Sequence, residues 1–189
     1  MTKVLAISGS LRSDSFNAKL LRNAVALLGD DVEVEILHGL RDVPPYDEDD
    51  DRDGAPEPVR ALRAAFAGAD AVFIATPEYN SSIPGHLKNA LDWVSRPLAT
   101  NPLRNKPAVV VGASTGAFGA VWAQAELRKV LAAIGARVVE AELAVGHAST
   151  RFDEDGTLVD EDLCEQLGEV VDALVSALAD RQELVRAAA

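Results

Sequence analysis

The sequence predicts an α/β fold: a three-layer sandwich whose middle layer is a five-stranded, doubly wound parallel sheet. Short apolar runs alternate along the chain with longer segments of helical periodicity. Two of these runs, 69–75 and 108–112, are almost wholly apolar, as expected of central parallel strands covered on both faces. No internal repeat or linker interrupts the alternation, so we expect residues 1–189 to form one domain.

The amino-terminal part of the chain reads as a strand, a helix and an edge strand. The apolar run 4–7 predicts the first strand, and the helical period over 15–28 predicts a helix that ends at Gly29. Residues 32–37 alternate apolar and polar side chains, which is typical of a strand near a sheet edge. We expect the acidic segment 39–54 to be a solvated loop; a metal site is the weaker alternative, because its consecutive carboxylates do not match a calcium loop.

The remaining elements continue the alternation and are bounded by Gly, Pro or polar residues. They are a helix at 58–67, the strand at 69–75, a helix at 86–94, the strand at 108–112, a helix at 120–134, a strand at 137–143 and a closing helix at 161–178. In such sheets, ligands bind beyond the carboxyl ends of the strands, where the strand order switches.

Composition and charge narrow the classes of partner and compartment. The formal net charge of -12 argues against nucleic acid and anionic membranes. We see neither a signal peptide nor an apolar run near the roughly 20 residues of a spanning helix. Cys164 is the single cysteine, which suits a reducing cytoplasm. The three histidines have no partners at metal-ligand spacing, so no metal is expected.

Three segments at strand ends carry residues suited to a ligand; we name them loop one (8–17), loop two (76–85) and loop three (113–119). Loop one turns through Gly9 into a helix, and its serines and Arg12 surround the unpaired N–H groups of the helix start. This suits an anion, although a serine-rich helix cap without a ligand fits loop one as well. Loops two and three add an aromatic ring, an amide, hydroxyls and glycines. A flat heteroaromatic compound with a phosphate tail would match the whole set.

Two motifs make the sequence recognisable. They are Gly9-Ser-Leu-Arg-Ser-Asp-Ser-Phe-Asn17 and Pro77-Glu-Tyr-Asn-Ser-Ser-Ile-Pro-Gly-His-Leu-Lys-Asn-Ala-Leu-Asp-Trp93. Together they resemble the NADPH-dependent FMN reductase family of flavodoxin-like proteins, which includes bacterial quinone, chromate and azo-dye reductases. The resemblance covers residues 2 to about 143 and implies a flavodoxin-like fold, bound FMN, and NADPH or NADH as hydride donor.

The resemblance also implies a cofactor site drawn from all three loops. Loop one would hold the FMN phosphate, loop two would line the isoalloxazine ring, and loop three would approach the flavin from the other side. The implied residues are Ser10, Arg12, Ser15, Phe16, Asn17, Pro77, Glu78, Tyr79, Asn80, Ser114, Thr115, Gly116 and Gly119. The chain departs from the family pattern at Ser81, where Gly is common, and at Ser13-Asp14, where Lys-Gly is common. Asp14 would repel the phosphate unless its side chain points outward.

The implied function is that of an FMN-dependent NAD(P)H oxidoreductase with a ping-pong cycle. Electrons would pass from the nicotinamide through FMN to a quinone, chromate, an azo compound or free flavin. Hydride transfer needs no acid–base side chain, so no catalytic residue is assigned; Arg12, Arg96 and Arg104 are candidates for the NADPH phosphates. The alternative is an FMN-binding electron carrier without NADPH activity, whose acidic surface would suit basic partners. The resemblance further implies a homodimer or homotetramer.

Overall fold

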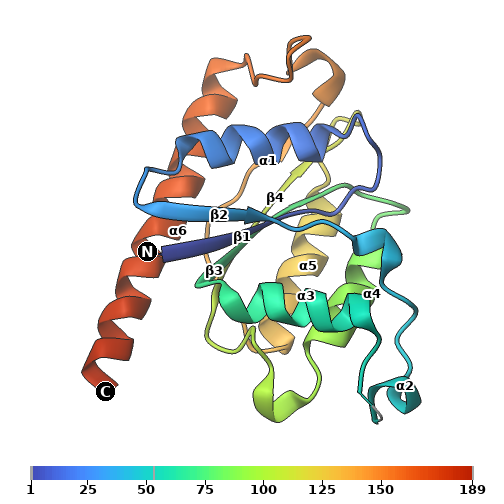
Figure 1. The fold of residues 1–189 in the computed structure, drawn as a ribbon. Coiled ribbons are helices and arrows are strands. Elements are labelled where there is room, and N and C mark those ends of the chain that lie inside the picture. Colours follow the sequence, from blue (N-terminus) through green and yellow to red (C-terminus); the bar gives the residue numbers. More distant parts are fainter. Residues whose placement is uncertain (1, 53, 189) are drawn as a thin grey trace.

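The computed structural model describes residues 2–52 and 54–188 and confirms the predicted fold class (Figure 1). A parallel sheet with the strand order β2-β1-β3-β4-β5 forms the middle layer, and a further short strand, β6, pairs with β4. The strands are β1 (Thr2–Ser8), β2 (Val32–Ile36), β3 (Ala71–Thr76), β4 (Pro107–Ala113), β5 (Arg137–Val138) and β6 (Ala144–Val145). The order switches between β1 and β3, which is where such sheets bind ligands.

Helices cover both faces of the sheet, and each face has its own apolar core (Figure 1). One face carries α1 (Phe16–Leu27) and α6 (Glu161–Ala188); the other carries α3 (Glu57–Gly68), α4 (Gly85–Val94) and α5 (Val121–Ala133). Leu5 and Ile7 of β1 contribute to the second core, whereas Val4 and Ala6 contribute to the first. Both faces of the central strands are therefore buried, which explains their nearly continuous apolar sequence.

The predicted fifth strand, 137–143, is wrong in detail. Pairing with β4 stops after β5 and resumes only at β6. In between, the guanidinium of Arg128 from α5 donates to the backbone oxygens of Val110 and Ala141, at 2.9 and 3.0 Å. The side chain thus takes the place of strand-to-strand hydrogen bonds, which local apolar alternation cannot reveal.

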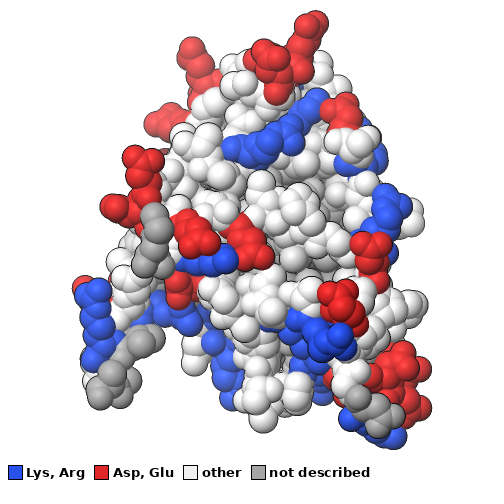
Figure 2. All heavy atoms as spheres, in the orientation of Figure 1, with Lys and Arg blue, Asp and Glu red and all other residues white. Residues whose placement is uncertain are grey.

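The acidic segment 39–54 is more ordered than the predicted loop. It contains a 3₁₀ turn, η1 (Leu40–Asp42), and a short helix, α2 (Glu48–Arg52). Figure 2 shows the side chains of α2 as an acidic cluster. Residue 53 lies outside the described residues. The side chains of Asn89 and Trp93 both donate to the backbone oxygen of Pro44, each at 2.8 Å. Within the described ranges, no group of three or more His, Cys, Asp or Glu side chains could hold a metal ion.

The closing helix α6 continues past residue 178, where the helical pattern was predicted to end. Polar contacts hold the extension to the amino-terminal edge of the sheet. Arg137 contacts Asp180 at 3.2 Å, Arg181 contacts Asp70 at 3.1 Å, and Gln182 donates to the hydroxyl of Thr2 at 2.6 Å. None of the described helices is both long and apolar enough to cross a membrane. Short 3₁₀ turns, η2 (Leu98–Thr100) and η3 (Ala148–Thr150), complete the chain.

Candidate functional site

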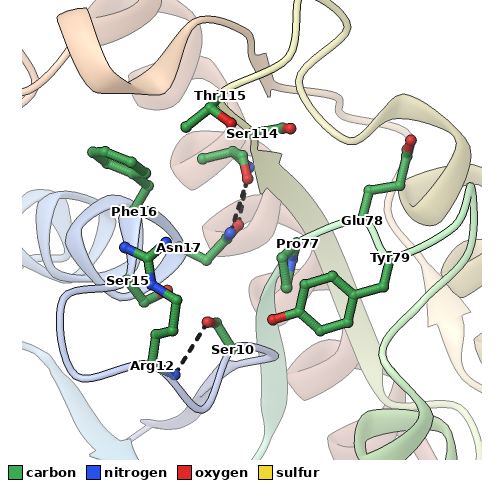
Figure 3. A pocket seen from close by; sticks show the side chains of 11 residues that line it. Ser10, Arg12, Ser15, Phe16, Asn17, Pro77, Glu78, Tyr79, Ser114 and Thr115 are labelled. Carbon is green, nitrogen blue, oxygen red and sulfur yellow. Dashed lines mark hydrogen bonds between the residues drawn. The ribbon is translucent and has the colours of Figure 1, made fainter.

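Loops one, two and three meet at the carboxyl ends of β1, β3 and β4 and enclose a cavity of about 150 Å³ (Figure 3). Most of the predicted site residues line it, together with Ala113, which was not predicted. The lining residues are Ser10, Arg12, Ser15, Phe16, Asn17, Pro77, Glu78, Tyr79, Ala113, Ser114 and Thr115. Asn80, Gly116 and Gly119 are not among them.

Gly9 brings loop one close to the end of β3, to loop two and to the start of α4. Its N–H donates to the backbone oxygen of Ala75 at 2.8 Å, and its own oxygen lies 2.8 Å from Nε2 of His86. A Cβ atom at this position would lie 3.0 Å from a methyl carbon of Leu87 and 3.2 Å from the ring of Pro77. A side chain here would therefore push loop one away from loop two and from the start of α4.

Loop one presents its hydrogen-bond donors at the start of α1. Ser15 caps the helix, because its Oγ accepts the N–H of Ala18 at 3.3 Å, and the Oγ of Ser10 accepts the N–H of Arg12 at 3.4 Å. Each hydroxyl accepts from the backbone and so keeps its own proton to donate. Arg12 is the only cation among the lining residues. With the free N–H groups of the first helical turn, these groups make a set of donors of the kind that binds anions.

Asp14 does not face this cavity. Its carboxylate lies 2.8 Å from Nζ of Lys19, and its side chain is 72% exposed. The hydrogen bond from Lys19 lowers the pKa of Asp14 below its usual value. The carboxylate that interrupts the family pattern is therefore neutralised locally and turned toward solvent.

Asn17 joins loop one to loop three. Its Nδ2 donates to the backbone oxygen of Ala113 and its Oδ1 accepts the N–H of the same residue, both at 2.9 Å (Figure 3). The side chain is buried, with 3% of the residue exposed. The amide is thus committed to the protein backbone, and it connects the loops that follow β1 and β4 across the intervening β3.

Loop two is a tight hairpin. The backbone N–H and oxygen of Tyr79 pair with those of Ser82, at 3.0 and 3.2 Å, and the turn between them consists of Asn80 and Ser81. Both turn residues have positive φ, 53° and 60°. This turn needs left-handed backbone conformations, which explains why Gly suits the position of Ser81. Asn80 lies at the tip of the turn, outside the cavity lining.

The glycines of loop three serve packing against the segment that contains β6. Gly119 has φ +57°, and a Cβ atom there would lie 2.4 Å from the backbone of Ala144. The oxygen of Gly116 accepts the N–H of His147 at 3.0 Å. Close backbone contact explains the glycine at 119, and neither glycine lines the cavity.

Sequence reasoning missed two neighbours of Phe16. The ring of Phe152 stacks on Phe16 with centroids 5.9 Å apart, and Nζ of Lys19 lies 5.2 Å from the Phe16 centroid. Lys19 lies one helical turn after Phe16, so helical spacing could have revealed it. Phe152 comes from a distant connection, and no local pattern in the sequence points to it.

Two of the proposed NADPH-binding arginines lie elsewhere. Arg104 precedes β4 and so lies toward the amino ends of the strands, opposite the cavity. Arg96 follows α4 and lines a different hollow with Tyr46 and Leu98. Of the three candidates, only Arg12 lines the cavity.

The strand order, with a cavity at the β1–β3 switch point, defines a flavodoxin-like protein. The family model for NADPH-dependent FMN reductases matches residues 2–150, and the chain belongs to this family.

Known proteins similar to the chain agree with this assignment. The chain is 40% identical to an NAD(P)H-dependent FMN reductase of Pseudomonas aeruginosa, over 91% of this chain and 92% of that protein. It is 38% identical to a 2-hydroxy-1,4-benzoquinone reductase of a Burkholderia species, over 95% and 98%. Its fold matches that of FerB, an NAD(P)H:(acceptor) oxidoreductase from Paracoccus denitrificans, with a TM-score of 0.87, 37% identity and coverage of 95% and 98%.

Proposed function

We propose that the cavity between loops one, two and three holds FMN and that residues 1–189 form a single FMN-binding domain. The chain is an FMN-dependent NAD(P)H oxidoreductase of the quinone reductase type, which reduces a small-molecule acceptor. The observation that supports the proposed site is the set of donors at the start of α1: two free hydroxyl protons, backbone N–H groups and the charge of Arg12.

The size of the cavity fits part of FMN. At about 150 Å³ it is smaller than the roughly 300–1,000 Å³ typical of a site for a whole ligand of this size. The donors belong to the phosphate end, so we assign the phosphate and the sugar chain to the cavity. The flat ring would extend from it along loop two, past Pro77 and the exposed side chain of Tyr79.

The protein's part in the reaction is to bind, orient and shield FMN. When bound, FMN supplies the redox chemistry, taking a hydride from NAD(P)H and returning electrons to the acceptor. Arg12 offsets phosphate charge, and the hairpin of loop two gives the ring a rigid edge. Because donor and acceptor would enter by the same open side, we expect ping-pong kinetics. Chromate and azo compounds remain proposed acceptors beside quinones and free flavin.

We also propose a cytoplasmic homodimer or homotetramer. An apolar patch at the end of loop three and the start of α5 supports association: Phe118 is 65% exposed and Trp122 49% exposed, with their ring centroids 5.1 Å apart. The single cysteine, Cys164, supports a reducing compartment. Analytical ultracentrifugation of the FMN-loaded protein tests the assembly; a monomer at micromolar concentration would contradict it.

The function is tested by loading the protein with FMN and mixing it anaerobically with NADPH or NADH. We expect the oxidised-flavin absorbance to bleach faster than that of free FMN. If FMN binds but neither nicotinamide reduces it, the electron-carrier alternative is correct.

The site is tested separately by titrating FMN into variants. Arg12→Gln should weaken FMN binding about tenfold, since it removes one charge-assisted contact to phosphate. Arg41→Gln is a matched control, because Arg41 also borders loop one, donating to the oxygen of Leu11 at 3.2 Å, yet does not line the cavity. Equal loss in both variants, or no loss in Arg12→Gln, would contradict the proposed phosphate site.

A further inference from the structure

Helix α5 begins beside the cavity without a cap of its own. The preceding residue, Ala120, has φ +63°, and its side chain cannot accept a hydrogen bond. The N–H groups of Val121 and Gln124 donate to backbone oxygens of the preceding turn, at 3.2 and 3.0 Å. The N–H groups of Trp122 and Ala123 therefore need acceptors from outside the helix.

Glu78 of loop two supplies both. Its Oε2 accepts the N–H of Trp122 at 3.1 Å and that of Ala123 at 3.2 Å. Glu78 lies between Pro77 and Tyr79, which both line the cavity, and the hairpin that follows fixes its backbone. A rigid part of loop two is thus bonded to the first turn of α5, and loop three leads directly into that turn.

The charge of Glu78 also favours a bond to α5 over a bond to a phosphate-bearing ligand. Glu78 is the only acidic residue among those that line the cavity, and a free carboxylate there would oppose a phosphate. Its bonds hold the charge at the positive end of α5, across the cavity from Arg12 (Figure 3). Through Oε2 the carboxylate is therefore engaged with the first turn of α5.

We propose that Glu78 is a positioning residue that fixes the distance between loops two and three by capping α5 from outside the helix. This proposal rests on the proposed FMN site. Loss of the cap leaves two N–H groups without acceptors, so the first turn of α5 frays and loop three loses its fixed position. The aromatic pair Phe118 and Trp122 flanks the same turn and would move with it.

The test compares Glu78→Gln with Glu78→Ala, because glutamine keeps an acceptor oxygen and alanine removes it. The two readouts are amide hydrogen exchange at Trp122 and Ala123 in FMN-free protein, and the Kd of FMN from quenching of flavin fluorescence. In Glu78→Ala we expect both amides to exchange at least tenfold faster and FMN to bind about tenfold more weakly. In Glu78→Gln both readouts should stay within about threefold of the unaltered protein. If glutamine weakens FMN as much as alanine while the amides stay protected, the charge acts directly and the proposal is wrong.

Asn101→Ala provides a control at the other end of the same helix. Asn101 donates to the oxygen of Ile134, the residue after α5, at 2.6 Å, and accepts the N–H of Leu103 at 2.9 Å. This variant should unfold more easily but bind FMN within about twofold of the unaltered protein. Equal weakening of FMN binding in Asn101→Ala and Glu78→Ala would show general loosening of α5 and overturn the proposal. Failure of the unaltered protein to bind FMN would instead refute the proposed site, because the exchange readout needs no FMN.

Discussion

Replacing Asn17 with alanine should damage both the stability of the protein and its affinity for FMN. The Asn17 side chain makes hydrogen bonds of 2.9 Å with the N–H and with the oxygen of Ala113. Both groups of Ala113 are buried, so alanine at position 17 would leave a backbone donor and a backbone acceptor without their partner.

The size of the effect follows from these contacts. Each net hydrogen bond contributes about 1 kcal/mol, and a buried group left without a partner costs about 1–3 kcal/mol. Partial access of water to the space left by the amide reduces the sum. We therefore expect the free energy of unfolding to fall by about 2–4 kcal/mol, which lowers the Tm of a domain of this size by roughly 5–15 °C. FMN affinity should fall at least tenfold, because loops one and three are no longer held together.

Urea unfolding of FMN-free protein, followed by circular dichroism, measures the first effect, and FMN titration measures the second. Asn23→Ala is a matched control on the same helix. Asn23 donates to the oxygen of Gly156 at 2.8 Å and accepts the N–H of Leu158 at 3.0 Å, and it does not line the cavity. This control should lose stability and bind FMN normally. The reasoning is refuted if the free energy of unfolding of Asn17→Ala lies within about 0.5 kcal/mol of that of the unaltered protein, which is roughly the accuracy of such comparisons. It is also refuted if Asn17→Ala and Asn23→Ala lose FMN affinity equally.

Other substitutions test separate features of the structure. Ser81→Gly should raise the free energy of unfolding by about 0.5–1 kcal/mol, because glycine removes the strain of φ +60° at some cost in chain entropy; a lower urea midpoint would contradict this. Asp14→Asn should change the Kd of FMN less than about threefold at low salt, since Lys19 already neutralises the carboxylate; a tenfold gain would mean that the ion pair does not shield it. Lys106 is 2% exposed and donates to the oxygen of Phe66. Burial lowers the pKa of Lys106 to about 8. Between pH 8 and 10.5 the unfolded chain therefore binds more protons at Lys106 than the folded protein does. The free energy of unfolding of the unaltered protein, relative to that of Lys106→Met, should rise by roughly 2–3 kcal/mol over this pH range. Paired urea unfolding curves measure this difference. A constant difference would contradict the lowered pKa.

The sequence by itself determined the layered fold and the location of the candidate site. Apolar runs and helical periods report whether one or both faces of a segment are buried, and this property survives in any correct packing. The alternation of strands and helices was therefore sufficient to predict a parallel sheet. In such a sheet all loops that follow strands lie at one edge, so loops one, two and three were expected together before any contact was known.

The resemblance to the FMN reductase family supplied the cofactor and the candidate residues for its site. It could not assign their individual tasks. Asn17 and Glu78 stand in motifs that resemble ligand-binding segments, yet their side chains bond to the backbone of Ala113 and to the start of α5. A motif preserves the identity of a residue but not the direction of its side chain.

Only the tertiary structure decided which partners those side chains find. Arg128 interrupts the last strand because packing brings its guanidinium to Val110 and Ala141. The end of α6 lies against the sheet, where Gln182 donates to Thr2. These contacts join residues far apart in the chain, so no local period or spacing records them. A hydrogen bond depends on the final position of both partners to within a fraction of an ångström, whereas burial depends only on which side of a segment faces the core.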